Sequence, residues 1–148
     1  SAVNKLISNK DAVLAPLRAS LDIAFDTSAL EAETEELQSE IMVTSDLIQK
    51  CICENAHVAL DQTEYQKRYD GLTARFDSAK AQLEEIDSAI ADKKSRRATI
   101  EAFMDTLAQA DLMEKFDPAL WCGLVDFVTV YSKDDVRFTF RNGMEIRA

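Results

Sequence analysis

The sequence contains few residues that interrupt regular structure and few that carry out catalysis. Its 148 residues include three Gly, two Pro and one His. Gly and Pro weaken or end helices, so their scarcity allows long helices. No glycine-rich phosphate loop is present, nor any Ser/His/Asp or paired-carboxylate arrangement that would indicate an active site. We therefore predict that this chain is not itself an enzyme and has no catalytic residue.

Signals for membranes and secretion are also absent. The sequence has no run of 18 apolar residues that would indicate a transmembrane helix, and no signal peptide is evident. The three cysteines are an odd number without the spacing of a disulfide framework, which favours reduced thiols and a cytoplasmic location. We expect no membrane partner. Because the sequence begins at Ser1 without an initiator Met, we also expect a fragment of a longer protein.

The cysteines and the histidine do not form a recognisable metal motif. Cys51 and Cys53 are two residues apart, so they would not face the same direction on a helix. A zinc site would need both of them together with His57 and Cys122 in one tetrahedron. Small thiols without a metal are the favoured interpretation. We predict no metal and no other cofactor in this chain.

Acidic residues outnumber basic ones, and the excess lies mainly in one segment. The net charge is −10, of which residues 26–60 contribute −7 and residues 61–100 contribute 0. Affinity for nucleic acids depends mostly on cations, so an acidic chain is a poor nonspecific ligand for DNA. If the protein acts on DNA, we expect other parts of a larger protein to make most of the contacts.

Two long segments have the apolar periodicity of paired helices. In residues 28–55 the pattern repeats with spacings of four and three residues, which is typical of a heptad seam. Its positions, the first seam, are Leu30, Thr34, Leu37, Ile41, Thr44, Ile48 and Cys51. The second seam continues the same spacing after an Asp61 N-cap and Glu64. Its positions are Tyr65, Tyr69, Leu72, Phe76, Ala79, Leu83, Ile86 and Ile90.

A short connection between two such helices favours an antiparallel arrangement. We predict a mainly α fold, with an antiparallel coiled-coil hairpin over residues 27–98 and a tip near residues 54–61. Lys93 and Arg97 take the next two seam positions, so the helix is expected to loosen or change its partner there. Ile100 resumes the apolar face.

The two ends of the chain are expected to pack near the base of the hairpin. Residues 1–26 predict a helix that Pro16 breaks or kinks. In residues 99–148, Asp117 and Pro118 predict the start of a short helix. Alternating apolar residues and the Asn142–Gly143 turn signal then predict a small antiparallel β-ribbon. Such a ribbon is marginal alone and must pack on helices or on another sheet.

Two stretches resemble the C-terminal region of large serine site-specific recombinases, the resolvase or integrase type of mobile elements. One is ENAHVALDQTEYQKRYDGLTARFDSAKAQLEEI, residues 54–86, and the other is FDPALWCGLVDFVTVYSKDDVRFTFRNGMEI, residues 116–146. The first contains the family's N…ALDQ-x-x-Y-x-x-R-Y pattern, from Asn55 to Tyr69. The second contains the F-D-x-x-L-W pattern, beginning at Phe116, and the closing F-x-F ribbon. None of these motifs is catalytic.

The resemblance implies a role in DNA recombination and integration through contacts between proteins. Family members have an N-terminal catalytic domain with a nucleophilic serine, a DNA-binding domain and a zinc ribbon from which a coiled-coil arm projects. The arm contacts other recombinase subunits and controls synapsis, while the full-length protein binds DNA. Any zinc ion would be expected upstream of residue 1, because the ribbon cysteines precede the arm. The alternative is a coiled-coil adaptor or scaffold that is unrelated to DNA.

Two groups of residues are candidates for partner contacts. At the tip, His57, Val58 and Leu60 could dock on another arm, or they could be an ordinary loop tucked over the helix ends. A second group could touch DNA phosphates, or could be solvated or ion-paired. It consists of Lys93, Lys94, Arg96 and Arg97 in the only dense basic run, and of Arg137 and Arg141 on the ribbon.

Overall fold

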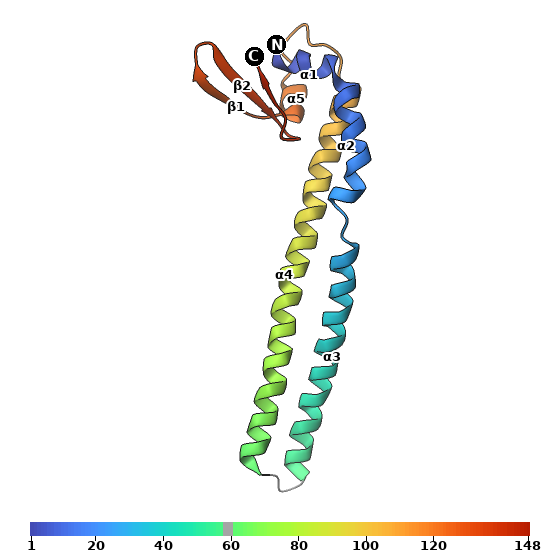
Figure 1. Cartoon of the computed structure of the whole chain (residues 1–148), viewed down its shortest axis with the longest axis vertical. Helices are drawn as coiled ribbons and strands as arrows, with labels where there is room; N and C mark the ends of the chain where they lie inside the picture. Colours follow the sequence, from blue (N-terminus) through green and yellow to red (C-terminus); the bar gives the residue numbers. More distant parts are fainter. Residues whose placement is uncertain (58–60) are drawn as a thin grey trace. The chain divides into compact units, whose positions relative to one another are not determined.

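The computed structural model describes residues 1–57 and 61–148, and these are mainly helical (Figure 1). Within these described residues, five helices and three strands follow one another along the chain. They are α1 (Ala2–Ser8), α2 (Lys10–Ala24), α3 (Ser28–His57), α4 (Gln62–Gln109), α5 (Pro118–Leu124), β1 (Val125–Ser132), β2 (Asp135–Phe140) and β3 (Glu145–Arg147). The chain forms two compact units. The two-helix unit is Thr27–Lys93, and the terminal unit is Ser1–Asp26 with Lys94–Ala148.

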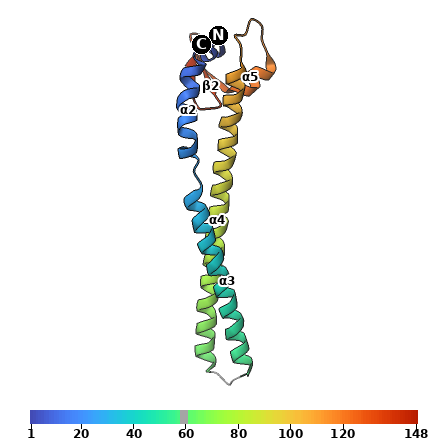
Figure 2. The same ribbon diagram turned by 90° about the vertical axis from the view of Figure 1, so that its right-hand side faces the viewer.

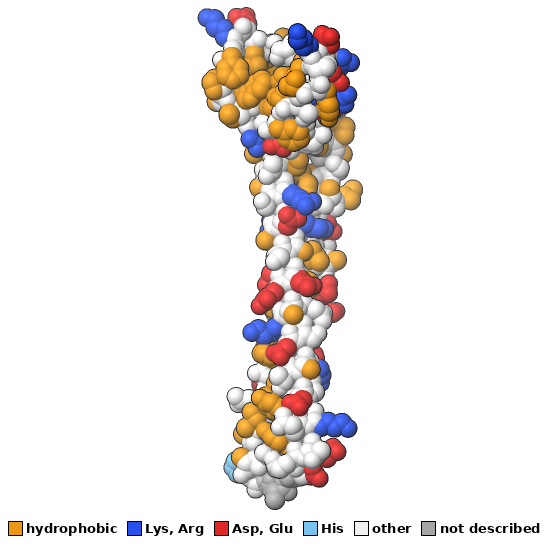
Figure 3. All heavy atoms as spheres, turned by 90° about the vertical axis from the view of Figure 1, so that its left-hand side faces the viewer, with side chains coloured by type: hydrophobic (Ala, Val, Ile, Leu, Met, Phe, Trp, Pro, Cys, Tyr) orange, Lys and Arg blue, Asp and Glu red, His pale blue; other side chains and the backbone are white. Residues whose placement is uncertain are grey.

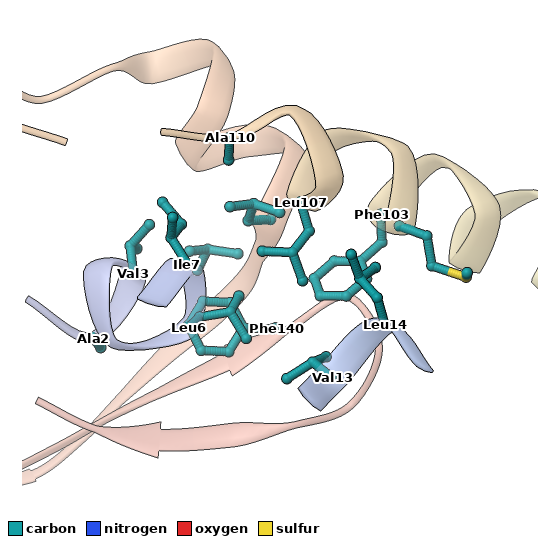
Figure 4. Packing of buried hydrophobic residues seen from close by; sticks show 13 residues of the cluster. Ala2, Val3, Leu6, Ile7, Val13, Leu14, Phe103, Leu107, Ala110 and Phe140 are labelled. Carbon is teal, nitrogen blue, oxygen red and sulfur yellow. The ribbon is translucent and has the colours of Figure 1, made fainter. Parts of the chain in front are cut away.

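The terminal unit contains a continuous hydrophobic core built from both ends of the chain. Thirteen buried residues of α1, α2, the end of α4, α5 and the sheet form one cluster (Figure 4). Leu6, Phe103, Leu107 and Phe140 are among its fully buried side chains. The amphipathic faces of short helices and the inner face of the ribbon therefore cover one another, as the marginal stability of an isolated ribbon requires.

The C-terminal ribbon forms as the sequence predicts. Asp117 caps α5, with its carboxylate accepting hydrogen bonds from the amides of Ala119 (2.9 Å) and Leu120 (3.1 Å). The three strands form an antiparallel sheet in the order β1-β2-β3. Gly143 adopts a φ of 85° in the turn before β3, a region that favours glycine. Trp121 packs edge-on against Phe138, with ring centroids 5.5 Å apart, and so anchors the ribbon on α5.

Two boundaries differ in detail from the sequence predictions. The N-terminal helix is divided at Asn9, between α1 and α2, whereas Pro16 lies inside α2. The apolar face around Pro16 is buried at Val13 and Leu14, and this packing offsets the lost backbone hydrogen bond. The tip was predicted near residues 54–61, and α3 continues to His57 within that range. Residues 54–57 are helical although they have no clear apolar stripe.

Candidate interaction surfaces

The two helices of the two-helix unit lie side by side and run in opposite directions (Figures 1 and 2). Arg68 of α4 pairs with Glu54 of α3 at 2.9 Å, and Arg75 of α4 pairs with Glu40 of α3 at 2.8 Å. The later residue of α4 thus meets the earlier residue of α3, as expected for antiparallel helices. Near the connection, the side-chain amide of Gln62 donates a hydrogen bond to the side-chain oxygen of Asn55 at 3.0 Å. Asp61 caps α4 through the amides of Thr63 and Glu64, as predicted.

The predicted seam positions form the less exposed face of each helix. All seven positions of the first seam and all eight of the second are buried or half-buried. The fully covered members are small or medium-sized: Thr44, Cys51, Ala79 and Ile86. The Thr44 hydroxyl donates to the Glu40 carbonyl of its own helix at 2.7 Å, so it adds no bond between the helices. The contact between α3 and α4 is therefore narrow and mostly apolar.

The structure describes only one of the three residues that were predicted to form a docking surface at the tip. His57 is exposed at the end of α3, and its Nδ1 lies 2.8 Å from the Cys53 carbonyl oxygen. Val58 and Leu60 lie outside the described residues, so the predicted docking surface at the tip stays a prediction.

Exposed hydrophobic side chains on α3 were not identified from the sequence. Met42 is 67% exposed, Val43 47% and Ile52 45%. All three lie off the first seam. A helix that contacts a single neighbour needs no large apolar residue outside its seam. Apolar residues outside the seam are therefore the sequence signal that could have identified them. The three residues do not form one continuous face, because at 3.6 residues per turn Val43 and Ile52 lie about 180° apart around α3, with Met42 between them.

The basic run on α4 is partly engaged in ion pairs. Arg97 pairs with Asp22 of α2 at 2.7 Å and with Glu101 one turn later at 2.9 Å. The hydrogen bonds that Arg97 donates to Glu101 and Asp22 raise the pKa of its guanidinium. Within the terminal unit α4 thus faces α2, in agreement with the expected change of partner near Lys93 and Arg97. Lys94 is exposed beside them.

Arg137 on the ribbon is surrounded by acceptors. Its guanidinium donates two hydrogen bonds to Asp135, both 3.0 Å long, and one to Glu145, 3.1 Å long. It also lies over the Tyr131 ring at 4.8 Å. The bonds from Arg137 lower the pKa of the Asp135 carboxyl, and Asp135 in turn raises the pKa of Arg137. This arginine presents little unpartnered charge to an external phosphate.

Arg141 is held differently and lies beside the basic run. Its Nε donates to the Cys122 carbonyl at 2.8 Å, a bond that fixes the guanidinium while leaving its two terminal nitrogens for other acceptors. Arg141 and Arg96 line the same pocket of the terminal unit, about 380 Å³ in volume. The structure therefore brings together one predicted DNA-binding residue of α4 and one of the ribbon, which lie 45 positions apart in the sequence.

The outer strand of the sheet exposes a second hydrophobic surface. Phe127 is 54% exposed, Val130 69% and Tyr131 63%, and β1 has only β2 as a neighbour in the sheet. Hydrophobic side chains gather over this part of the terminal unit, while charged side chains of both signs are spread along the two-helix unit (Figure 3).

In residues 1–57 and 61–148, no group of three or more His, Cys, Asp and Glu side chains is arranged to hold a metal ion. No described helix has the length and apolar character needed to cross a membrane. No protein-family model, curated protein or solved structure matches the chain.

Proposed function

We propose that this chain is the non-catalytic C-terminal region of a serine site-specific recombinase. In this role the two-helix unit is an antiparallel coiled-coil hairpin that contacts other recombinase subunits, and basic residues of the terminal unit add accessory contacts to DNA. Support comes from the resemblance over residues 54–86 and 116–146, together with the antiparallel pairing of α3 and α4. The observation that carries the proposal is the exposure of two large apolar side chains of α3, Met42 and Ile52, which lie about 80° apart around the helix.

The geometry of α3 separates internal packing from external contact. Its seam residues already face α4, so Met42, Val43 and Ile52 are not required for pairing the two helices. Removing such side chains from water on association yields roughly 25 cal/mol per Å² of apolar surface. A second subunit that covers this surface would gain this energy without disturbing the seam. The charged residues around it would then restrict which partners can approach.

Solution mass tests the contact between subunits directly. We expect the wild-type chain to self-associate in sedimentation velocity experiments as its concentration rises, in moderate salt that screens the repulsion between acidic chains. The double change Met42→Glu with Ile52→Glu should leave monomers. The matched control Ala29→Glu with Ala32→Glu adds the same charge at exposed positions on the other side of α3 and should behave like the wild type. A wild-type chain that stays monomeric throughout contradicts the contact.

The tip is tested in the same measurement by a separate variant. Val58→Asp with Leu60→Asp should weaken association if the predicted tip surface also contributes. If the α3 variant dissociates and the tip variant does not, the contact lies along α3 alone.

The reading frame upstream distinguishes a recombinase from the alternative, a coiled-coil scaffold that is unrelated to DNA. The proposal expects a serine-containing catalytic domain and a C-x-x-C pair there. An upstream sequence without either would overturn the recombinase assignment, and self-association of the chain would then support the scaffold.

A further inference from the structure

The outer side of β1 has no neighbouring strand among the described residues (Figure 1). β1 is eight residues long, and its only charged residue is Asp126. Natural proteins usually protect a sheet edge with several charges, with proline or with a covering loop, because the unpaired backbone groups can accept another strand. With a single charge and no proline, β1 has the composition of a strand that can be paired.

The hydrogen bonds of β2 identify which of its residues face β3. The Phe140 amide donates to the Met144 carbonyl at 2.8 Å, and the Ala148 amide donates to the Val136 carbonyl at 2.9 Å. The direction of hydrogen bonding alternates from residue to residue along an antiparallel strand. The even-numbered residues of β2 therefore bond to β3, and its odd-numbered residues bond to β1.

The same alternation identifies the backbone groups on the outer side of β1. Phe127 and Thr129 lie opposite odd-numbered residues of β2, so their amides and carbonyls bond to that strand. The amides and carbonyls of Val128 and Val130 point the other way. We call this side of the strand, with its two exposed valines, the β1 edge. Each valine presents one donor and one acceptor there.

An antiparallel strand of the same sequence is complementary to the β1 edge. Hydrogen bonds form only between outward-pointing residues, so Val128 of one copy can pair with Val130 of the other, and the reverse, about a two-fold axis at Thr129. Thr129 then lies opposite its own copy, and Phe127 lies opposite Tyr131. Apolar, threonine and aromatic pairs of this kind are favourable between neighbouring strands.

Charge distinguishes this register from the two neighbouring ones. An axis at Val130 would place Asp126 opposite Asp134 of the second copy, and like charges directly opposite each other are destabilising. An axis at Val128 would place the Asp126 carboxylate opposite the apolar side chain of Val130. With the axis at the central threonine, Asp126 lies opposite Ser132, whose hydroxyl can donate a hydrogen bond to a carboxylate.

We infer that the β1 edges of two copies pair antiparallel about a two-fold axis at Thr129, which joins the two sheets into one. This contact is separate from the α3 contact and does not depend on the proposed function. Bulges flank residues 127–130, so the regular part of the edge is short. The buried area should therefore lie below about 1,200 Å², in the range of weak contacts, with a dissociation constant of about 1 mM.

Such a weak contact becomes important when another contact already holds two chains together. Effective concentrations between linked proteins reach about the millimolar range, which is enough to populate the pairing. At the micromolar concentrations that suit sedimentation velocity, the free chain should hardly pair through β1. The test of the α3 contact and the test of the β1 edge can therefore fail independently.

Amide hydrogen exchange tests the pairing at high concentration. Met42→Glu with Ile52→Glu is the background in every sample, so that the α3 contact does not contribute. As the chain concentration rises to about 1 mM, the Val128 and Val130 amides should exchange about twofold more slowly, because half of the chains are then paired. The Phe127 amide already bonds within the sheet and should not change. Unchanged exchange at both valines would overturn the pairing.

A charged residue at the edge provides the matched comparison. Val130→Lys introduces two cations into each dimer and should weaken the pairing about tenfold. Ile23→Lys is the control, because it replaces an exposed β-branched residue of the terminal unit that lies on α2, away from the sheet. It should change the affinity less than about twofold. An equal loss in the two variants would mean nonspecific attraction between chains and would overturn the pairing.

Disulfide formation tests the register in a chain whose exposed cysteines, Cys53 and Cys122, are replaced with Ser. Residues at Thr129 would lie directly opposite each other, within the Cα separation of up to about 6.8 Å that a disulfide allows. Residues at Val128 would lie diagonally, about 7–8 Å apart. Thr129→Cys should therefore cross-link about tenfold faster in a glutathione redox buffer than Val128→Cys, although Val128 is the more exposed.

An exposed position on α2 gives the rate of random collision. Ser20→Cys serves this purpose in the same background. Faster cross-linking in Val128→Cys than in Thr129→Cys would overturn the inferred axis. If Thr129→Cys cross-links no faster than Ser20→Cys, a second copy does not occupy the β1 edge, and an extended segment of another protein would be its remaining partner.

Discussion

The two units of this protein are stabilised in different ways. In the terminal unit, thirteen buried residues from both ends of the chain form one cluster, with two phenylalanines and several leucines at its centre. In the two-helix unit, the described buried residues are Thr44, Cys51, Ala79 and Ile86. A buried large apolar side chain contributes about 1.5–3 kcal/mol, and small side chains contribute less. The terminal unit therefore has the stronger core for each residue that it orders.

The difference also concerns distance along the sequence. The core of the terminal unit joins Val3 to Phe140, whereas α3 and α4 are separated by only a few residues. Contacts between distant segments require more loop-closure entropy, so they form cooperatively or not at all. A narrow seam between adjacent helices can open in parts. We thus expect amide hydrogen exchange to be faster in α3 than in the core of the terminal unit.

Removing a core aromatic from the terminal unit should give the largest effect. Phe140 is 1% exposed, and Phe140→Ala should lower the free energy of unfolding by about 3–5 kcal/mol, because a cavity remains where the ring was. Urea denaturation measures the loss. Phe127→Ala is the matched control in the same sheet, since its ring is half exposed, and it should cost about 1 kcal/mol. Equal losses would show that the cluster is not the stabilising core.

Two glycines sharpen the contrast, because the same substitution should have opposite signs in the two units. A Cβ at Gly123 in α5 would lie 2.9 Å from the Thr106 methyl group, which a hydrogen bond of its hydroxyl to the Ala102 carbonyl holds in place. Overpacking of this kind costs about 1–3 kcal/mol, more than the helix gains from Ala. Gly123→Ala should therefore destabilise the terminal unit by about 1 kcal/mol.

At Gly71, on α4 of the two-helix unit, a Cβ meets no atom within 4 Å. Gly71→Ala should therefore stabilise that unit by about 0.5–1 kcal/mol, because Ala loses less backbone entropy in a helix. Thermal unfolding of both variants gives the comparison. A loss of stability in Gly71→Ala would mean that this helix face is covered by something that the described contacts do not include.

The buried threonine of the two-helix unit provides a smaller test. Thr44→Val replaces a hydroxyl that bonds only within α3 with a methyl group that can pack in the seam. We expect slower amide exchange around Thr44, corresponding to a gain of about 0.5–1 kcal/mol. Thr34→Val is the control, because Thr34 makes the same bond to its own helix but is only half-buried. A larger gain at position 34 would place the tightest contact elsewhere.

Periodicity in the sequence predicted the helical face of each long segment and the ribbon. The seam spacing follows from the 3.6-residue turn, and the ribbon from alternation and the Asn142–Gly143 pair. Both signals are local, so they can be recognised without knowing which segment packs against the element. The cap at Asp117 is local too. What these signals predict is the type of an element and the face that it buries.

Features that depend on distant packing were not predictable. Nothing local distinguishes Asn9 from Pro16 as the division between α1 and α2, and the result depends on how Val13 and Leu14 pack. The pocket of Arg96 and Arg141 likewise exists only because α4 and the turn before β3 meet in space. The two arginines were candidates individually, but their association required the three-dimensional fold.

The smallest expected effect concerns the ion pairs on the sheet. Hydrogen bonds from Arg137 lower the pKa of the Asp135 carboxyl below that of the unfolded chain. This pair therefore stabilises the fold fully above the unfolded pKa, and the contribution is lost as the pH falls through the folded pKa, below about pH 4. The carboxyl is half-buried at the surface of the sheet, so solvent still screens the pair and keeps the effect small.

Asp135→Asn removes this titration but keeps a side chain of nearly the same shape. Between pH 6 and acid, its free energy of unfolding should fall less steeply than that of the wild type, with the two curves converging below about pH 3. The carbon signal of the Asp135 carboxyl, followed during an acid titration, should have its midpoint below the ordinary value for aspartate. A midpoint at or above that value would show that Arg137 does not hold this carboxylate in solution. The sheet would then be stabilised by its buried face alone. A well-buried apolar face is the property that distinguishes the terminal unit from the two-helix unit.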